Sequence, residues 1–339
     1  MRRRARRLLP LPLILLLAGC AGQTATIQPT SVPTVVALPQ VSALGDAHVF
    51  VSDIATGDVA ELGVGAWHLS RSVHGLGLSP DRAWLYVTDV ATSRLFAFRL
   101  TTTGLGETHA VTVGSQPVHV AASRDGSRIF VTNFGERSLS VVDTAHWKVI
   151  KSIPTAASPH SIIASPDGKT LYVGCYAGAA ITVVDAASET ATRTIALPPN
   201  TEPFGLALDA TGRYLYASDN LTGRLIIVDI TKDAVVGAVA VGQRPALIAR
   251  APDSQTLYVS AGASHAVAVV SIADPLRPVV REMIAVQGYP HGIAVTPDGR
   301  RLIVAGTSAN TLTVIDTASL TVLATVPGER DPNDVLVAR

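Results

Sequence analysis

Short runs of apolar residues separated by polar turns fill residues 46–339, and one such run occurs seven times. Each copy centres on two or three apolar or aromatic residues and ends on small or polar ones. The copies are His48–Asp53, Leu85–Asp89, Ile129–Asn133, Leu171–Cys175, Leu215–Asp219, Leu257–Ala261 and Leu302–Gly306. Measured at the second apolar position, the intervals between copies are 36, 44, 42, 44, 42 and 45 residues. A period of about 40–45 residues with strand-like contents predicts sheets arranged radially around an axis.

One complete unit has the pattern of four strands. In the fourth unit, residues 159–164 predict a first strand and Ser165–Gly168 a turn, in which Pro presets φ and Gly accepts a positive φ. Residues 171–173, 181–185 and 192–197 predict three further strands. The aromatic residue of each second strand is expected to pack between neighbouring sheets. The repeat region shows no sustained helical spacing of apolar residues, so we expect almost no helix.

The two ends of the repeat region are incomplete in complementary ways. The region begins near Ala47 with a second-type strand, and its first-type strand is missing. Residues 332–338 at the C-terminus have the pattern of a first-type strand with no successor. Strands from both ends can complete one sheet, which removes an open edge and closes the ring. The sequence therefore predicts an all-β, seven-bladed β-propeller of four-stranded antiparallel blades, closed by pairing of its N- and C-terminal strands.

The first 45 residues differ from the repeats. Residues 1–19 combine five arginines with an apolar stretch and lead into Leu17-Ala-Gly-Cys20, which is typical of a lipoprotein signal peptide. By resemblance to bacterial lipoproteins, Cys20 is expected to carry a membrane-anchoring lipid; an ordinary export signal is the alternative. Residues 20–45 have the composition of a flexible tether, and residues 46–339 are the propeller. The two residues after Cys20 are not acidic, so we expect an exported, envelope-anchored protein, at the outer membrane if the organism is Gram-negative.

Charge and cysteine content narrow the range of partners. Removal of residues 1–19 takes away five arginines, which lowers the formal net charge from +1 to −4. A mildly acidic chain without a basic cluster disfavours nucleic acid as a partner. The second cysteine of the chain, Cys175, is expected to be a buried, unreactive thiol. We expect a monomer. Apart from the membrane to which its lipid attaches it, its expected partner is a small molecule or an envelope protein.

Alignment of the repeats places several histidines at one level of the fold. The start of each first-type strand is expected to open on the mouth of the central channel. The residues at this position in successive units are His74, Val118, His160, Phe204, Ala246, His291 and Asn333. His119 is one residue out of register, which allows its ring to point elsewhere. Neutral imidazoles there can bind a small ligand, ligate a metal, or act as acid and base.

The candidate ligand-binding residues are His74, His119, His160, Phe204, His291 and Asn333. A solvated channel lining, a small-ligand site and a divalent-metal site are all compatible with them, and no residue is assigned a catalytic role. The chain contains no G-x-S-x-G, H-E-x-x-H or phosphate-loop motif, and the absence of C-x-x-C-H excludes covalent c-type haem. The aspartates that end the third strands are expected to accept backbone hydrogen bonds in the following turns; they are Asp143, Asp185, Asp229 and Asp316.

The repeat resembles that of a known family. Tyr289–Gly299 (YPHGIAVTPDG) and Leu312–Thr317 (LTVIDT) are similar to the repeat of the YVTN family of seven-bladed β-propellers, and the similarity covers roughly residues 46–339. The resemblance implies the fold more strongly than an activity, because relatives of this family include surface-layer and adhesion proteins, lactonase-like enzymes and cytochrome d1-like redox domains.

Three functions are compatible with this resemblance. The sequence favours a ligand-binding or protein-interaction module without enzymatic activity, since no familiar catalytic motif occurs. The alternative is a hydrolytic enzyme with a His-lined site at the channel mouth, because Pro290-His-Gly-Ile-Ala294 is similar to the repeat of lactonase and streptogramin-lyase propellers. The third is an accessory to periplasmic redox chemistry, in which a histidine ligates a non-covalent cofactor.

Overall fold

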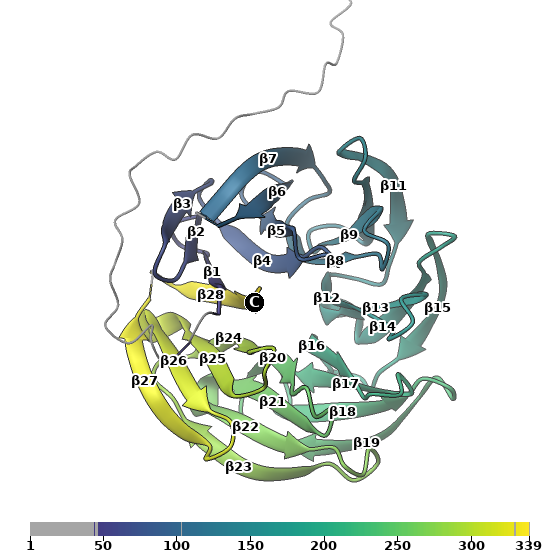
Figure 1. The fold of residues 1–339 in the computed structure, drawn as a ribbon. Helices are drawn as coiled ribbons and strands as arrows, with labels where there is room; N and C mark the ends of the chain where they lie inside the picture. The colour runs from purple at the N-terminus through teal and green to yellow at the C-terminus, as the bar shows by residue number, and fades with distance from the viewer. Residues whose placement is uncertain (1–43, 45–46, 103, 329, 339) are drawn as a thin grey trace, which may run out of the picture.

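Seven four-stranded antiparallel sheets surround a central axis in the computed structural model, which describes residues 44, 47–102, 104–328 and 330–338 (Figure 1). We call the sheets blades 1 to 7. From the axis outward, blade 1 contains β28 (Pro332–Val337), β1 (Val49–Asp53), β2 (Asp58–Glu61) and β3 (Gly65–His68). Blade 2 contains β4 (Val73–Leu78), β5 (Trp84–Asp89), β6 (Arg94–Thr101) and β7 (Gly104–Thr112).

Blades 3 to 7 repeat this arrangement, each with its earliest strand innermost (Figure 1). Blade 3 contains β8 (Pro117–Ala122), β9 (Arg128–Asn133), β10 (Ser138–Asp143) and β11 (Lys148–Pro154). Blade 4 contains β12 (Pro159–Ala164), β13 (Thr170–Cys175), β14 (Ala180–Asp185) and β15 (Thr190–Ala196). Blade 5 contains β16 (Pro203–Leu208), β17 (Tyr214–Asp219), β18 (Arg224–Asp229) and β19 (Ala234–Ala240). Blade 6 contains β20 (Pro245–Arg250), β21 (Thr256–Ala261), β22 (Ala266–Ser271) and β23 (Val279–Ala285), and blade 7 contains β24 (Pro290–Val295), β25 (Arg301–Gly306), β26 (Thr311–Asp316) and β27 (Thr321–Pro327).

Blade 1 closes the ring with strands from both ends of the chain. β28 pairs antiparallel with β1, from Val49 opposite Val337 to Asp53 opposite Pro332. Figure 1 shows the C-terminal strand as the innermost member of the blade that begins the chain. The predicted seven-bladed propeller and its terminal clasp are therefore confirmed. The strands β2 and β3 have four residues each, fewer than the corresponding strands of other blades, which accounts for the short first interval.

Helix is limited to short 3₁₀ segments within the described ranges, as predicted. Three of them follow the second strands of blades 4, 6 and 7: η2 (Tyr176–Gly178), η3 (Gly262–Ser264) and η4 (Thr307–Ala309). None of the helical segments in this part of the chain has the length and apolar character needed to cross a membrane.

Aromatic residues of the second strands pack between neighbouring blades, as predicted. Tyr86 of β5 belongs to a buried cluster with Ile129 and Val131 of blade 3. Tyr216 of β17 likewise packs in a cluster with Leu257 of blade 6. These two tyrosine side chains are no more than 2% exposed. Each blade therefore buries its apolar face only against the next blade, which makes the ring the unit of stability.

Residues at the ends of the strands have the expected structural roles. The four third-strand aspartates each accept a backbone N–H from the turn that follows, as the Asp229 carboxylate does from Thr231 at 3.0 Å. Cys175, the last residue of β13, is fully buried and forms no disulfide. Burial raises the pKa of its thiol, so the thiolate is disfavoured.

Hydroxyl groups near the ends of the second strands connect neighbouring blades. The Thr132 hydroxyl accepts the backbone N–H of His119 at 2.9 Å and donates to the carbonyl of His160, in the next blade, at 2.8 Å. The same arrangement is formed by Ser52, Thr88, Ser218 and Ser260. The small polar residue of the repeat thus fixes the spacing between inner strands, and with it the positions of the side chains at their beginnings.

Replacement of Thr132 by valine is expected to lower the free energy of unfolding by about 2–4 kcal/mol, because the shape is kept while a buried N–H and a buried carbonyl lose their partner. Urea unfolding followed by circular dichroism measures the difference. The control is Thr194→Val on the exposed face of β15, with an expected change of less than about 0.5 kcal/mol. Equal effects of the two substitutions would contradict a role for the hydroxyl in connecting the blades.

Candidate functional site

Four histidines converge at the beginnings of the inner strands. His74, His160 and His291 are the second residues of β4, β12 and β24, and His119 is the third residue of β8. The centroid of the His74 ring lies 5.3 Å from that of His119, 5.7 Å from that of His160 and 6.2 Å from that of His291. The Phe204 ring, from the start of β16, lies 3.9 Å from the His160 ring and 5.3 Å from the His291 ring. We call these five side chains the imidazole cluster.

His119 joins the cluster although it is one residue out of register. The alignment allowed its ring to point elsewhere, but the ring centroid lies 4.9 Å from that of His160. The register shifts by one residue in β8, as it does in the other inner strands: Pro117 pairs with Asn133 and Val120 with Val131. In such a bulge, side chains do not strictly alternate between the two faces of the sheet.

Two hydrogen bonds to main-chain carbonyls fix the tautomers of two rings. His160 Nδ1 donates to the carbonyl of Phe204 at 3.0 Å, and His291 Nδ1 donates to the carbonyl of Asn333 at 2.9 Å. Because a carbonyl oxygen only accepts, each neutral ring carries its proton on Nδ1 and keeps a lone pair on Nε2. Both residues therefore present a basic nitrogen on the side away from the backbone. Asn333, the sixth predicted ligand-binding residue, contributes its main-chain carbonyl, which accepts the hydrogen bond from His291.

Burial keeps the imidazoles in their neutral form. His74 and His160 are 9% and 4% exposed. Loss of hydration, followed by the neighbouring His291, lowers the pKa of His160 to about 3, against the smaller, opposite effect of its bond to Phe204. The same cause lowers the pKa values of His74, His119 and His291, and the neighbouring imidazoles add to it at the first two. Near neutral pH the cluster therefore provides hydrogen-bonding nitrogens without net charge.

Several buried polar atoms in and beside the cluster have no hydrogen-bond partner among the described residues. They are His74 Nδ1, His119 Nε2, Ser161 Oγ and Asn333 Nδ2. A buried polar atom left unpaired costs about 1–3 kcal/mol. Such atoms indicate positions where a water or a ligand supplies the missing partner. Three of the four belong to residues that the sequence alignment selected.

A buried carboxyl group also lies at this level of the channel. Asp334 of β28 accepts the backbone N–H of Leu76 in blade 2 at 3.0 Å and that of Val335 at 2.9 Å. Burial raises the pKa of Asp334 to about 6, because it outweighs the effect of these two bonds. Asp334 occurs in the repeat alignment, but the aligned sequence does not show that its carboxyl group is buried.

A second group of side chains adjoins the cluster. The ring centroids of Phe134 and Tyr176 lie 6.1 Å and 6.4 Å from that of His160. The Tyr176 hydroxyl donates to the Glu202 carboxylate at 2.6 Å. Burial, followed by this carboxylate, raises the pKa of Tyr176 to about 12, and the positive charge of Arg244 acts on the same phenol in the opposite direction. Aromatic, acidic and basic groups are thus available beside the imidazoles.

Sequence reasoning missed this second group. Phe134 and Tyr176 directly follow β9 and β13, whereas Glu202 and Arg244 directly precede β16 and β20. The aligned positions that carry the histidines all lie inside the inner strands. Extending the alignment by one residue beyond the second strands and one residue before the inner strands places these four side chains at the same end of the propeller.

Other predictions for the site have no support in the structure. In the described ranges, no three His, Cys, Asp or Glu side chains are arranged to hold a metal ion. Cys20 and the boundaries after residues 19 and 45 lie outside the described residues. The lipid anchor, the tether and the outer-membrane location therefore stay predictions, as do the monomeric state and the expected partners.

Comparison with known proteins found one family model that matches this chain. The family model described as "Lactonase, 7-bladed beta-propeller" matches residues 65–236 and 108–325. No curated protein matches the chain. Among solved structures, the periplasmic gluconolactonase of Pseudomonas aeruginosa is 19% identical with a TM-score of 0.72, over 86% of this chain and 98% of that chain. A putative 6-phosphogluconolactonase from Bacteroides uniformis is 18% identical with a TM-score of 0.71, over 86% and 99%.

Hydrazine synthase of Kuenenia stuttgartiensis is 21% identical with a TM-score of 0.66, over 77% of this chain and 88% of that chain. At such identities, the likeness to solved structures shows the propeller fold and no more.

Proposed function

Because this chain belongs to the family of seven-bladed β-propeller lactonases, we propose that it hydrolyses a lactone, a cyclic ester, at the imidazole cluster. The structural neighbours named as a gluconolactonase and as putative 6-phosphogluconolactonases support the same proposal. These comparisons favour the hydrolytic alternative over the binding module that the sequence favoured. The absence of a familiar motif was a weak argument, since in a propeller the reacting groups come from separate blades.

The observation that carries the proposal is the convergence of four neutral imidazoles from four blades, two of them with buried, unpartnered nitrogens. Hydrogen-bonding nitrogens without charge suit an ester, whose carbonyl oxygen accepts hydrogen bonds and becomes negative only during the reaction. The carbonyl oxygen of a bound ester can supply the partner that these nitrogens lack among the described residues.

Hydrolysis requires a proton to leave water and to reach the departing oxygen. Nε2 of His160 or His291 accepts the proton of a water molecule while the water oxygen attacks the carbonyl carbon. His74 Nδ1 or His119 Nε2, in the tautomer that carries a proton there, donates a hydrogen bond to the carbonyl oxygen as it becomes an oxyanion. The tetrahedral intermediate collapses, the ring C–O bond breaks, and the imidazolium returns its proton to the alkoxide. The product is the open hydroxy acid.

The low pKa of the buried imidazoles favours the second half of this sequence. An imidazolium whose pKa lies near the value of about 3 found for His160 is a strong proton donor. It therefore protonates the departing alkoxide readily, and the site returns to its neutral state. The first half gains from positioning, because the water and the ester are held against a base nitrogen with a fixed lone pair.

The side chains next to the cluster favour a sugar lactone as the substrate. Phe204 and Tyr176, with ring centroids 6.0 Å apart, provide apolar surface for the C–H face of a sugar ring. Glu202 accepts and Arg244 donates hydrogen bonds of the kind that sugar hydroxyls and a product carboxylate form. An aldonolactone, with an ester carbonyl inside a ring of hydroxyl-bearing carbons, offers both kinds of contact.

Acid release in a pH-stat tests the proposal with D-glucono-1,5-lactone, its 6-phosphate and δ-valerolactone. We expect hydrolysis of at least one sugar lactone above the spontaneous rate. His160→Gln combined with His291→Gln is expected to lower kcat by about 100-fold or more, because both base nitrogens are lost. His146→Gln, an exposed change in a turn of blade 3, is the matched control and is expected to leave kcat unchanged.

Two results would refute the lactonase proposal. One is that the wild-type protein accelerates none of the three lactones. The other is that the double variant, with a cooperative unfolding transition that shows it is folded, is as fast as the wild type.

A further inference from the structure

Crevices of one kind lie between neighbouring blades, beside the turn that follows the inner strand. In the part of the chain that the structure describes, three such crevices lie between blades 2 and 3, blades 3 and 4, and blades 6 and 7. Their volumes are about 730, 310 and 390 Å³ in that order. Each is bounded by that turn in one blade and by the turn after the third strand of the next blade. The fold therefore produces the crevice, and the residues at matching positions decide its chemistry.

An ion pair spans the crevice between blades 3 and 4. Arg128, the first residue of β9, pairs with Glu189 of the next blade at 2.9 Å and with Asp143 of its own blade at 2.8 Å. At the positions of Arg128 and Glu189, the crevice between blades 2 and 3 has Trp84 and Trp147, with ring centroids 5.1 Å apart. An aromatic pair replaces the ion pair in the largest of the three crevices, which we call the tryptophan pocket.

Aromatic side chains form one wall of the tryptophan pocket. The His109 ring stacks on that of Trp147, with centroids 4.2 Å apart and planes 12° from parallel, and lies 5.4 Å from Trp84. Trp147 has a φ of 49°, and Glu189 and Leu320 have similar values in the corresponding turns. The three turns thus share one backbone conformation. Of the three crevices, only the one between blades 2 and 3 has an indole at this position. Two of the protein's three tryptophans gather there.

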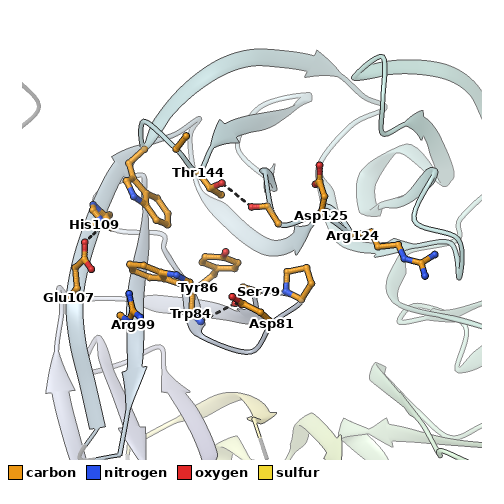
Figure 2. Close-up of a pocket in the computed structure, with 14 residues that line it drawn as sticks. Ser79, Asp81, Trp84, Tyr86, Arg99, Glu107, His109, Arg124, Asp125 and Thr144 are labelled. Atoms are coloured by element: carbon orange, nitrogen blue, oxygen red, sulfur yellow. Dashed lines mark hydrogen bonds and ion pairs between the residues drawn. The ribbon is translucent and has the colours of Figure 1, made fainter.

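Charged groups of both signs surround the aromatic wall. Figure 2 shows Asp81 on one side of the Trp84 ring, with Arg99 and Glu107 on the other. The Glu107 side chain is 55% exposed, and Asp81 and Arg99 are exposed as well. The Ser79 hydroxyl and a backbone N–H lower the pKa of Asp81, so its carboxylate is ionised at neutral pH. The pocket therefore offers carboxylate acceptors and guanidinium donors around apolar rings.

We propose that the tryptophan pocket binds an uncharged oligosaccharide of pyranose units. A pyranose has a C–H face that packs on an indole and a rim of hydroxyl groups that both donate and accept hydrogen bonds. Stacked aromatic rings, carboxylates and an arginine match both properties. The volume of about 730 Å³ also lies in the range of small-ligand sites, about 300–1,000 Å³.

An organic cation is the other ligand that aromatic rings and carboxylates suit. The carboxylates that line the pocket are those of Asp81, Glu107 and Asp125. The guanidinium group of Arg99, on the same side of the Trp84 ring as Glu107, offsets part of their negative charge and disfavours a cation beside it. In addition, His109 and Trp147 lie flat against each other and form a platform, whereas a cation is held best by rings that face it from several sides. The arrangement therefore favours the hydroxyl-rich, uncharged ligand.

The tryptophan pocket is separate from the imidazole cluster. His74 is the second residue of β4, whereas Ser79, which lines the pocket, follows the last residue of that strand. A strand rises about 3.3 Å per residue, so roughly 16 Å of strand separate the two residues. Saccharide binding at the pocket is therefore independent of lactone hydrolysis and leaves the imidazole end of the channel uncovered.

Titration of the full-length protein with cellotriose, chitotriose and maltotriose tests the proposal, with choline as the cationic probe. In a Trp67→Phe background, Trp84 and Trp147 are the remaining tryptophans, so fluorescence reports on the pocket. We expect a saturable change with at least one trisaccharide, confirmed by isothermal titration calorimetry. Trp84→Thr with Trp147→Leu, which installs the residue types of the crevice between blades 6 and 7, is expected to weaken binding measured by calorimetry at least about tenfold, with lactone hydrolysis unchanged.

A second variant and a control separate recognition from folding. Asp81→Asn keeps both indoles and is expected to weaken binding of the same trisaccharide several-fold. Leu320→Val, in the crevice between blades 6 and 7, is the control and is expected to have no effect. Three results overturn the proposal: no trisaccharide gives a saturable signal by either method, the folded double variant binds as tightly as its parent, or choline alone binds.

Discussion

Deletion of residues 332–339 is expected to abolish cooperative folding of the propeller. The deletion removes β28, which pairs with β1 along its length and carries the buried residues Asn333, Asp334 and Val335. Each lost hydrogen bond is worth about 1 kcal/mol, and each buried aliphatic side chain about 1.5–3 kcal/mol. Their sum is comparable with the whole stability of a typical domain, about 5–15 kcal/mol. The loss is also not local, because blades 7 and 2 each contact β28.

Circular dichroism and urea unfolding of the truncated chain measure this effect. A synthetic peptide of residues 330–339, added in excess, is expected to restore a cooperative transition by pairing with the free edge of β1. An unfolding midpoint of the truncated chain equal to that of the full chain would show that the clasp is dispensable.

A steep loss of stability is expected as the pH falls below about 6.5, the value at which histidines of the unfolded chain become protonated. Burial lowers the folded-state pKa values of His74, His119, His160 and His291. The folded state therefore binds fewer protons than the unfolded chain below this pH. The stability contributed by each imidazole is complete above about pH 6.5 and is lost as the pH falls toward its folded-state pKa.

The expected magnitude is large for so few residues. Each buried imidazole contributes up to about 1.4 kcal/mol per pH unit. For His160, the difference between 6.5 and about 3 corresponds to an upper limit of about 5 kcal/mol. Asp334 acts in the opposite direction: its raised pKa of about 6 means that its contribution is present in acid and is lost as the pH rises through that value. Four imidazoles outweigh one carboxyl group, so acid is expected to destabilise the propeller.

Urea midpoints between about pH 7 and pH 5 test this balance. His160→Gln is expected to make the decline shallower by up to about 1.4 kcal/mol per pH unit, because one proton-linked group is removed. Asp334→Asn is expected to make it steeper below about pH 6, because the opposing group is lost. Coincident curves for the wild type and His160→Gln would contradict the burial of a neutral imidazole in the channel.

The repeat pattern was sufficient to predict the architecture, because blades 2 to 7 are local units of four consecutive strands each. A run such as Leu85–Asp89 has the same neighbours in sequence and in space, so its period gives the number of blades directly. The clasp was also predictable, since the missing first strand near Ala47 and the surplus strand at residues 332–338 complement each other. The alternation of apolar and polar residues was enough for these conclusions.

The candidate site was predictable only in part. Position in the repeat placed His74, His160 and His291 at one level of the channel, but the bulge in β8 that brings His119 to them depends on how β8 pairs with β9. The low pKa values and unpartnered nitrogens depend on burial, which is a property of the closed ring. Tyr176 and Glu202 were missed because they lie one residue outside the strands that were compared.

The amino-acid sequence by itself determined the number of blades, their strand order and the way the ring closes, because six blades form from consecutive strands and the two incomplete ends of the repeat complement each other. Only the tertiary structure decided which side chains meet. Trp84 and Trp147, like the four histidines, belong to different blades, and their contacts arise from the twist and spacing of adjacent sheets. Those distances, and the exclusion of water that sets the protonation of the imidazoles, exist only once the ring is complete.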